Sequence, residues 1–269
     1  MANQHEKASA FLTLHRPGNP LLLPNPWDPG SARILASLGF EALATTSSGA
    51  AAALGRLDGQ LTRDEALVHT AAIVASTPLP VSADLEKCFA DEPEGVAETI
   101  TLAARTGLAG CSIEDYTGDD AEPIYEITLA AQRVGAAAAA AHSRGMVLTA
   151  RCENHLHGRH DLGDTITRLQ AYAQAGADVL YAPGVRDLTD IRRIVAETDR
   201  PVNVLAMSGM PPVSELASAG VSRVSVGGAF AFCAYGALAQ AATELRTSGS
   251  YEYASLAAAG RDAVSRAFS

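Results

Sequence analysis

Paired cysteines are missing from this sequence. Its four cysteines lie far apart and form no Cys-x-x-Cys pair, standing at Cys88, Cys111, Cys152 and Cys233. This spacing argues against a zinc knuckle and a disulfide framework. We therefore expect reduced thiols and a cytoplasmic protein.

Long apolar runs are missing as well. No run approaches the roughly 18 apolar residues that indicate a membrane-spanning helix. The first ten residues mix His5, Glu6 and Lys7 with small residues, without an apolar core of signal-peptide length. We expect a soluble protein with no membrane partner.

Positive charge is scarce. The chain has 20 Lys and Arg residues against 30 Asp and Glu residues, a formal net charge of -10 at pH 7. This balance disfavours binding to nucleic acid or to an anionic membrane surface, so the expected partner is a small molecule. An anionic substrate would need a local cation, either Arg, Lys or a bound metal, to overcome the negative field.

Eight short apolar runs recur along the 269 residues, near positions 22, 44, 82, 112, 148, 180, 203 and 224. Helix-like segments with Gly or Pro punctuation separate them, which favours parallel strands. A length of about 250 residues suits one closed eight-stranded barrel. The sequence therefore predicts an α/β fold, a single (βα)8 TIM barrel spanning residues 1–269.

The expected helices start and end at recognisable signals. Asp28 before Pro29 is placed to cap one helix, and Thr62 with Glu65 forms a capping box for the next. A first short helix, Ala8 to Arg16, is expected to pack on the barrel exterior. Further helices are expected at about 93–106, 123–143, 162–175, 188–197, 213–219 and 229–246.

Residues 248–269, at the C-terminal end, are not needed for the eight strand–helix units of the barrel. Their segment from Tyr251 to Phe268 is helical in pattern and carries apolar residues that a closed barrel would leave in water. We expect an extra C-terminal helix that packs across, or is swapped with, a neighbouring subunit.

Charged side chains follow three of the strands. Asp84 and Glu86 end one apolar run, Glu114 ends the next, and Arg151 with Glu153 ends another. An unpaired carboxylate in a core costs several kcal/mol, so these groups should lie where the strands leave the core. The carboxyl ends of barrel strands form one mouth, where these side chains would converge.

A metal site is the first hypothesis for this mouth. Hard oxygen ligands in this number suit Mg²⁺, with Mn²⁺ as the alternative ion, and some would act through water. The alternative is that the acids cap helices or pair with Arg56, Lys87 and Arg151. The proposed metal residues are Asp58, Asp84, Glu86 and Glu114.

Arg151 is the candidate anchor for a substrate carboxylate or phosphonate, since its planar guanidinium binds such groups with two hydrogen bonds. A salt bridge to Glu114 or Glu153 is the alternative. The Thr46-Ser47-Ser48-Gly49 segment offers hydroxyl and backbone N–H groups for an oxyanion. The proposed substrate-binding residues are Ser47, Ser48, Gly49, Arg151, Asn203 and Trp27.

Two other features carry weaker hypotheses. The loop with His155, His157 and His160 has no fixed helical spacing, which favours a solvated or substrate-gating loop over a metal site. Cys88 follows the paired acids without an adjacent base, which favours packing over a role as nucleophile. A Trp is more often a packing residue than a ligand contact, but Trp27 follows a strand end and is therefore expected near the mouth.

Six segments together resemble the isocitrate lyase and phosphoenolpyruvate mutase superfamily, and the chain looks like a phosphonomutase-like member. The similarity runs from Asn25 to about Phe232, and the segments stand in the family's order at strand ends. They are Asn25-Pro26-Trp27-Asp28 with Ser31-Ala32, Ala44-Thr45-Thr46-Ser47, Asp84-Leu85-Glu86, Glu114-Asp115, Ala150-Arg151 and Pro201-Val202-Asn203-Val204.

The resemblance implies a Mg²⁺-dependent enzyme that makes or breaks a C–C or P–C bond next to a small 2-oxo acid through an enolate. It implies that Asp84 is the direct metal ligand, that Asp58, Glu86 and Glu114 hold metal-bound waters, and that Ser48, Gly49 and Arg151 bind the oxo-acid carboxylate. It also implies a homo-oligomer, a dimer or a tetramer built from helix-swapped dimers.

Two positions depart from the family pattern. Residues 116–123 hold neither the Lys nor the Cys of the lyases, and Tyr181 stands where the lyases carry Glu. We therefore predict that Arg151, Glu153 and Tyr116 act in catalysis, with Glu122, His155 and Tyr181 as further acid–base candidates. A carbon–carbon lyase is the first hypothesis, P–C bond chemistry the second and a non-catalytic oxo-acid-binding barrel the third.

Overall fold

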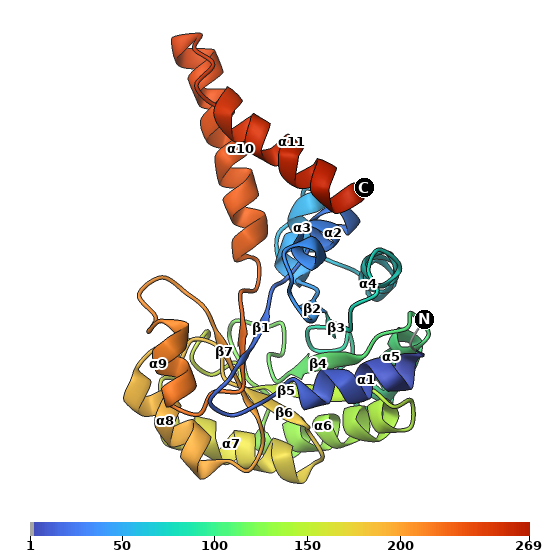
Figure 1. Cartoon of the computed structure of the whole chain (residues 1–269). Coiled ribbons are helices and arrows are strands. Elements are labelled where there is room, and N and C mark those ends of the chain that lie inside the picture. Colours follow the sequence, from blue (N-terminus) through green and yellow to red (C-terminus); the bar gives the residue numbers. More distant parts are fainter. Residues whose placement is uncertain (1–2) are drawn as a thin grey trace.

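The computed structural model describes residues 3–269 and has eight parallel strands alternating with helices (Figure 1). Neighbouring strands follow the order β1-β8-β7-β6-β5-β4-β3-β2, and a backbone hydrogen bond from Ala44 N to Pro24 O (3.0 Å) links the two ends of the sheet. The predicted barrel is thus confirmed, and it is nearly closed. The strands are β1 (Leu21–Leu23), β2 (Leu43–Ala44), β3 (Val81–Asp84), β4 (Gly110–Glu114), β5 (Val147–Arg151), β6 (Val179–Tyr181), β7 (Val202–Leu205) and β8 (Arg223–Ser225).

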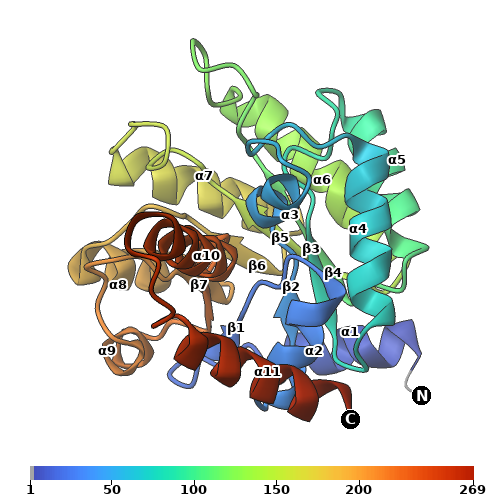
Figure 2. The ribbon, with the colours of Figure 1, turned by 90° about the horizontal axis from the view of Figure 1, so that it is seen from above.

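Helices surround the strands, as Figure 2 shows from above. Those of the first half are α1 (Gln4–Thr13), α2 (Pro29–Ser37), α3 (Ser47–Ala53), α4 (Arg63–Ala75), α5 (Pro93–Ala104) and α6 (Ile127–His142). Those of the second half are α7 (Leu162–Gln174), α8 (Leu188–Glu197), α9 (Val213–Ser218), α10 (Ala229–Ser248) and α11 (Ala254–Phe268). None of the helices within residues 3–269 is long and apolar enough to cross a membrane.

Local capping sets several of these boundaries. Asp28 caps α2 and the Thr62–Glu65 box caps α4, as the sequence predicts. Helix α6 begins at Ile127, later than the predicted Pro123, because the Glu126 carboxylate accepts hydrogen bonds from the backbone N–H groups of Thr128 and Leu129. Capping of these free N–H groups fixes the first turn at that point.

The apolar core lies between the sheet and the helices. Ile100 of α5, Leu148 of β5 and Leu169 of α7 are fully buried in it. On α6, Ala137 and Ala141 are also fully buried, and their small side chains let the helix lie close to its neighbours.

The inner face of the barrel is polar. Successive strand residues point to opposite faces, so residues two apart share one. On β3 to β5 this places Ser82, Ser112 and Thr149 inside the barrel, one step below Asp84, Glu114 and Arg151. The part of the interior just below the mouth therefore carries hydroxyl groups, while apolar side chains such as Val147 and Val179 lie at the amino-terminal end.

Helix α1 closes the amino-terminal end of the barrel. Its buried Ala8 and Phe11 pack with Leu21, Val147 and Val179, which begin three of the strands. The predicted place on the barrel exterior is thus wrong. Phe11 reaches so close to Gly110 that a Cβ there would lie 3.1 Å from its ring and 2.8 Å from the carbonyl oxygen of Val147.

Helix α10 projects away from the barrel instead of covering it as the eighth barrel helix (Figure 1). Among its twenty residues, Ala231 is the buried one. Helix α11 turns back along it and reaches α2, where the Arg33 guanidinium lies 4.6 Å from the Phe268 ring centroid. We call residues 229–269 the C-terminal arm; it is longer than the predicted extension at 248–269.

Candidate active site

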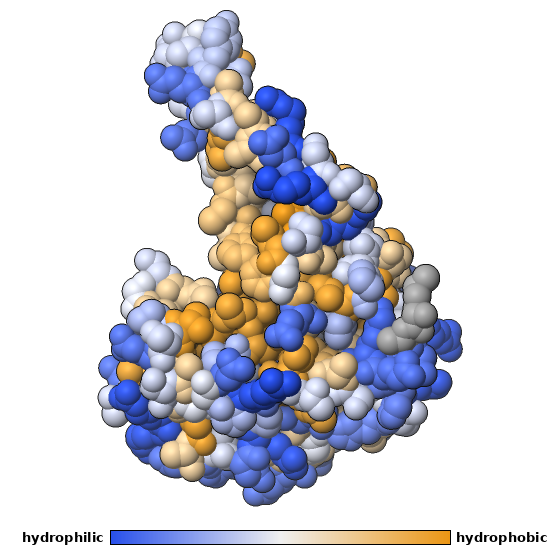
Figure 3. Space-filling view, in the orientation of Figure 1, coloured by the Kyte–Doolittle hydropathy of each residue, from blue (hydrophilic) through white to orange (hydrophobic). Residues whose placement is uncertain are grey.

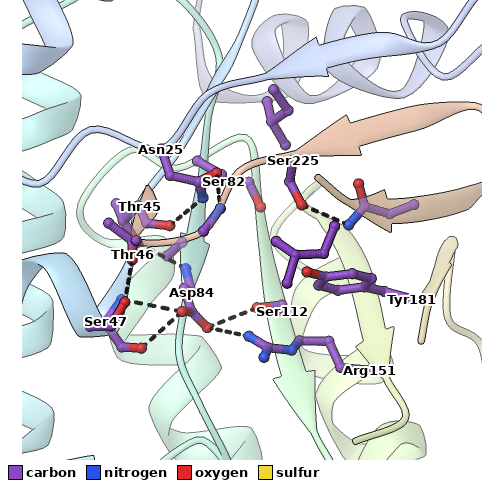
Figure 4. A pocket seen from close by; sticks show the side chains of 18 of the residues that line it. Asn25, Thr45, Thr46, Ser47, Ser82, Asp84, Ser112, Arg151, Tyr181 and Ser225 are labelled. Atoms are coloured by element: carbon purple, nitrogen blue, oxygen red, sulfur yellow. Dashed lines mark hydrogen bonds and ion pairs between the residues drawn. The ribbon is translucent and has the colours of Figure 1, made fainter. Parts of the chain in front are cut away.

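Two cavities share the mouth of the barrel. The inner cavity, of about 190 Å³, reaches down between the strands and is drawn in part in Figure 4. The outer cavity, of about 450 Å³, lies towards the loops after β3, β4 and β5. Ser47, Asp58, Arg151 and Leu156 line both cavities and therefore form the boundary between them.

Arg151 stands among three carboxylates at this boundary. Its Nη1 lies 3.0 Å from Asp84 Oδ1, its Nη2 lies 3.3 Å from Glu114 Oε2, and its Nε lies 2.7 Å from Glu153 Oε1. The predicted salt bridges to Glu114 and Glu153 are thus present. They do not exclude a substrate role, because three carboxylates around one cation leave a net negative charge that a bound cation would offset.

Asp84 is held from several sides. Its Oδ2 accepts hydrogen bonds from the backbone N–H (3.2 Å) and hydroxyl (3.1 Å) of Ser47, while Thr45 Oγ1 accepts one from the Asp84 backbone N–H (2.9 Å). The Ser112 hydroxyl lies 3.4 Å from Asp84 Oδ1. Figure 4 shows Asp84 with Thr45 and Ser47 on one side and Ser112 and Arg151 on the other. The carboxylate orientation is therefore fixed by the scaffold.

Glu86 lies in a strained loop after β3. Glu86, Cys88 and Phe89 all have positive φ angles, of 50°, 61° and 55°, a conformation that costs a residue with a side chain about 1 kcal/mol or more. The Glu86 Oε1 atom is buried without a hydrogen-bond partner. Burial, with the nearby charges of Asp84 and Asp58, raises the pKa of Glu86 to about 8. Strain and an unpaired oxygen of this kind cluster at functional sites.

Arg133 of α6 holds this loop in place, a role that the sequence does not reveal. Its guanidinium donates to the backbone carbonyl oxygens of Lys87, Ala90 and Asp91, each at 2.7 Å. The side chain is almost fully buried and stacks on the Tyr125 ring at 4.1 Å. A residue in the middle of an alanine-rich helix carries no local signal for such a contact.

Glu114 and Glu153 are more buried than Asp84. Burial raises the pKa of both carboxyl groups, and Arg151 opposes the shift. The backbone N–H of Glu153 donates to Asp115 Oδ1 (2.7 Å), and Asp115 in turn accepts from the Tyr172 hydroxyl. Asp115, held by Tyr172, therefore fixes the backbone of Glu153. The Glu153 side chain lies beside Arg151.

Ser47, Ser48 and Gly49 form the first turn of α3 rather than a loop. Ser48 lines the inner cavity, but Gly49 does not, and its backbone N–H donates to Thr46 Oγ1 (3.3 Å). A Cβ at position 49 would lie 2.9 Å from Trp27 Cβ. Gly49 is thus a close-packing position, and its contact with substrate stays a prediction.

Trp27 lies outside the mouth. It lines an apolar groove between α3 and α4 together with Leu54, Leu61 and Val68. Its backbone carbonyl contacts His69 Nε2 at 3.0 Å. Trp27 is not among the residues that line the two cavities of the mouth, and its contact with substrate stays a prediction.

Tyr116 and His157 stack over the outer cavity, with ring centroids 4.0 Å apart and an angle of 12° between the planes. The Tyr116 hydroxyl donates to Asp120 Oδ1 (2.9 Å). The two residues belong to the loops after β4 and β5, so their contact joins these loops at the rim. The histidine loop thus lies at the entrance, as the gating hypothesis expects.

Asn203 and Tyr181 form the wall opposite Asp84. Asn203 Nδ2 donates to Ser225 Oγ (2.9 Å), while its buried Oδ1 has no partner. The Arg151 guanidinium lies 5.3 Å from the Tyr181 ring centroid. Burial raises the pKa of Tyr181 to about 12, so its hydroxyl keeps its proton at neutral pH.

Asn25, which belongs to the first of the six family-like segments, links three strands at the barrel mouth. Its Nδ2 donates to Thr45 O (2.9 Å), and its Oδ1 accepts from the backbone N–H groups of Val226 and Gly227 (3.0 Å each). These bonds connect the ends of β1, β2 and β8, where the sheet has fewest ladder bonds.

The donor set fits a hydrated divalent cation better than a fully protein-bound one. Within residues 3–269, no three His, Cys, Asp or Glu side chains form a group that could hold a metal ion. Asp58, Asp84, Glu86 and Glu114 nevertheless all face the two cavities. Mg²⁺ commonly keeps several waters, so carboxylates beyond direct contact can still hold it. The unpaired Glu86 Oε1 is suited to accept from such a water.

The four cysteines are all free thiols. Cys88, Cys111 and Cys152 are buried, and burial raises the pKa of each thiol above its ordinary value. A buried protonated thiol is a poor nucleophile. This agrees with the packing role expected for Cys88.

The chain is similar to several known proteins. A solved structure from Burkholderia cenocepacia J2315, a candidate lyase/mutase, has a TM-score of 0.94 and 51% identity, covering 99% of this chain and 96% of that one. Oxaloacetate decarboxylase of Chromohalobacter salexigens is 30% identical over 86% of this chain and 82% of its own length. The 2-methylisocitrate lyase of Salmonella typhimurium is 28% identical over 81% and 77%.

The family model described as phosphoenolpyruvate phosphomutase matches residues 11–246. The match covers all eight strands and all of the residues that line the two cavities. The chain therefore belongs to the phosphoenolpyruvate phosphomutase family, within the isocitrate lyase and phosphoenolpyruvate mutase superfamily.

Proposed function

We propose that this protein is a Mg²⁺-dependent carbon–carbon lyase that acts on a small anionic 2-oxo acid through its enolate, with Mn²⁺ as an alternative ion. The observation that carries the proposal is the convergence of Asp58, Asp84, Glu86 and Glu114 on Arg151 at the barrel mouth. A family member with this constellation has the charges needed to hold both a cation and an oxo acid.

Asp84 is the proposed direct ligand, and Asp58, Glu86 and Glu114 would hold the cation through water. When bound, the cation would supply positive charge beside the oxygen that becomes negative in the enolate. The Arg151 guanidinium, beside these carboxylates, would bind the substrate carboxylate. Ser47 and Ser48 contribute hydroxyl groups on the adjoining wall.

Proton transfer is assigned to Glu153 and, at the rim, Tyr116. Glu153 is buried next to Arg151, and burial raises the pKa of its carboxyl group, which supports a role in carrying a proton. Tyr116 lines the outer cavity, where residues 116–123 contain no Cys or Lys. This difference supports a reaction other than isocitrate cleavage.

We also propose that the protein acts in the cytoplasm as a homo-oligomer, a dimer or a tetramer with the C-terminal arm exchanged between subunits. The apolar side chains on the arm support this assembly, since a free subunit would leave them in water.

The proposal is tested by turnover of the purified protein with Mg²⁺. Branched and unbranched 2-hydroxy di- and tricarboxylates, oxaloacetate, isocitrate and phosphonopyruvate would be offered separately. We expect a 2-oxo acid to be released from one of the hydroxy acids, and no glyoxylate from isocitrate in a phenylhydrazone assay. Cleavage of phosphonopyruvate with no C–C cleavage would instead indicate P–C bond chemistry.

Arg151→Lys provides the matched variant. Lysine keeps the charge but loses the planar pair of donors, so oxalate affinity should fall about tenfold or more. Calorimetry would measure it, with Arg144→Lys, at an exposed position, as the control. Wild-type oxalate affinity in Arg151→Lys would place the carboxylate anchor elsewhere. Oxalate binding with no turnover of any compound would favour a non-catalytic oxo-acid-binding barrel.

A further inference from the structure

A second arginine lies at the floor of the inner cavity. Arg223 begins β8 and is 4% exposed, yet it lines the same cavity as Arg151. Its neighbours in the sheet register are Leu21 of β1 and Asn203 of β7. The side chain therefore points into the barrel below the mouth residues.

Arg223 has no negative partner. Its Nη1 donates to Thr149 Oγ1 (3.1 Å) and to His15 Nε2 (3.2 Å), and its buried Nε has no partner. None of the ion pairs formed within residues 3–269 involves Arg223. Its cavity neighbour Arg151, by contrast, contacts three carboxylates.

His15 does not supply the missing charge. Its Nδ1 lies 2.9 Å from the Phe11 carbonyl oxygen, which fixes Nδ1 as the donor and leaves Nε2 to accept from Arg223. Burial and the charge of Arg223 lower the pKa of His15 to about 3. The imidazole is therefore neutral at physiological pH and cannot offset the guanidinium.

An uncompensated buried charge is costly, by several kcal/mol even after relaxation. A cost of this kind is offset when an anion occupies the adjoining space. The buried Asn203 Oδ1, on the neighbouring strand and lining the same cavity, also has no partner. The Arg223 guanidinium favours an anion, whereas Asn203 Oδ1 is an acceptor and needs a donor such as a hydroxyl, so the two groups together point to a polar ligand rather than to an apolar one.

We propose that Arg223 is an anion-binding residue at the cavity floor, and that the substrate carries a second anionic group which it binds there. The proposal rests on the proposed function and assigns Arg223 as the residue that favours substrates with two anionic groups over those with one. The Arg151 end binds the carboxylate next to the reacting carbon, and the Arg223 end binds the far carboxylate or phosphonate.

Arg223 could instead serve the fold alone, by linking β8 to β5 and α1 across the barrel floor. The two roles predict different results. A purely structural residue changes stability without regard to the charge of a ligand. An anion-binding residue changes the affinity for dianions relative to monoanions of the same shape.

The experiment uses three unreactive acids of similar length: succinate, 3-phosphonopropionate and butyrate. Calorimetry would measure their binding to the wild type, Arg223→Met and Arg223→Lys, with Mg²⁺ present. We expect the wild type to prefer a dianion, and Arg223→Met to lose about tenfold in affinity for it, the usual loss for one charge-assisted hydrogen bond. Butyrate affinity should not change, and Arg223→Lys should retain part of the preference.

His15→Gln is the matched control, since it disturbs the same floor contacts without removing the charge, and it should keep the dianion preference. A larger loss for succinate than for 3-phosphonopropionate identifies the second group as a carboxylate, and the reverse identifies a phosphonate. An unchanged dianion preference in Arg223→Met, or equal losses for all three acids, would overturn the proposal.

A measurement on the wild type covers the case in which Arg223→Met does not fold. The Nε–H NMR signal of Arg223, assigned with Arg223→Lys, should shift on titration with the preferred dianion but not with butyrate. No shift would refute the proposal. The three acids lack a 2-oxo group, so dianion binding without any lyase turnover would count against the proposed function alone. Lyase turnover with no dianion preference would count against Arg223 alone.

Discussion

Asp84 connects the parts of the candidate site, since one oxygen faces Arg151 and the other accepts from Ser47. We expect Asp84→Asn to weaken Mg²⁺ binding about tenfold or more, because a neutral amide is a much poorer ligand for a hard cation. Calorimetric titration with Mg²⁺ would measure this. Asp199→Asn, at an exposed position, should bind like the wild type. Equal affinities in the two variants would remove Asp84 from the metal site.

Glu86 should make the metal-free protein less stable as pH rises. Its pKa is about 8 in the folded protein against 4.5 ordinarily, so the folded state holds a proton that the unfolded chain has released. Stability from this source is complete below about pH 4.5 and is lost as pH rises towards 8.

Thermal unfolding in EDTA at several pH values tests this expectation. The wild-type Tm should fall between pH 5 and 8, and Glu86→Gln should show a smaller fall because glutamine does not titrate. If the two proteins have parallel Tm–pH curves, the carboxyl group does not carry the effect.

The sequence locates the charged residues of the site better than its neutral ones. Asp84, Glu86, Glu114, Arg151 and Glu153 could be predicted because charge at a buried strand end has few explanations, and a barrel brings such ends together. The sequence does not tell where a side chain points once the chain has left a strand, so it does not reveal that Trp27 lines the groove between α3 and α4. Arg223 was missed because it begins its strand instead of ending it.

The loop after β3 depends on a distant element for its conformation. Arg133→Met would remove three hydrogen bonds to backbone carbonyls and let the positive φ angles relax. We expect the free energy of unfolding to fall by about 3 kcal/mol. Mg²⁺ affinity should also fall, because Glu86 would lose its fixed position.

Hydrogen exchange separates this effect from a general loss of stability. Amides of residues 85–91 should exchange faster in Arg133→Met while those of β5 stay protected. Arg144→Met, just after the same helix and exposed, is the control. Uniformly faster exchange over the whole barrel would mean that Arg133 does not act on this loop in particular.

At the level of elements, the strands and most helices could be predicted, and the errors concern what a helix packs against. Helix α1 has an apolar pair, Ala8 and Phe11, that fits either the barrel wall or its floor, so periodicity could not choose between them. Serine and glycine favoured a loop at 47–49, but capping by Thr46 draws these residues into α3. Such outcomes depend on contacts made far along the chain.

The C-terminal arm sets the expected assembly of the whole molecule. Phe232, Leu238 and Leu245 on α10 and Leu256 on α11 are exposed, and Figure 3 shows apolar surface continuing from the barrel up the arm. We expect light scattering to give a mass at least twice 27.8 kDa at micromolar concentration, because these groups would be covered by a second copy.

Leu238→Asp should weaken this association, since an ionised carboxylate in an apolar interface is costly. Gln174→Asp adds the same charge at an exposed position of α7 and should leave the mass unchanged. A monomer in the wild type at these concentrations would show that the arm is not covered in this way. The sequence pattern of a helix does not show whether the helix packs on its own barrel or on the barrel of a second subunit. The position of α10 could therefore not be predicted from the sequence.

The closure of the barrel floor by α1 has a consequence for the order of events in catalysis. Phe11 packs against the starts of the strands at the amino-terminal end, and the inner cavity is lined by residues of the mouth, so we expect ligands to enter and leave through the mouth. Cleavage of one substrate would therefore yield two fragments that leave in sequence, the shallower one first. The deeper fragment should then inhibit competitively against substrate and the shallower one noncompetitively, so steady-state inhibition patterns would report which end of the substrate lies deepest.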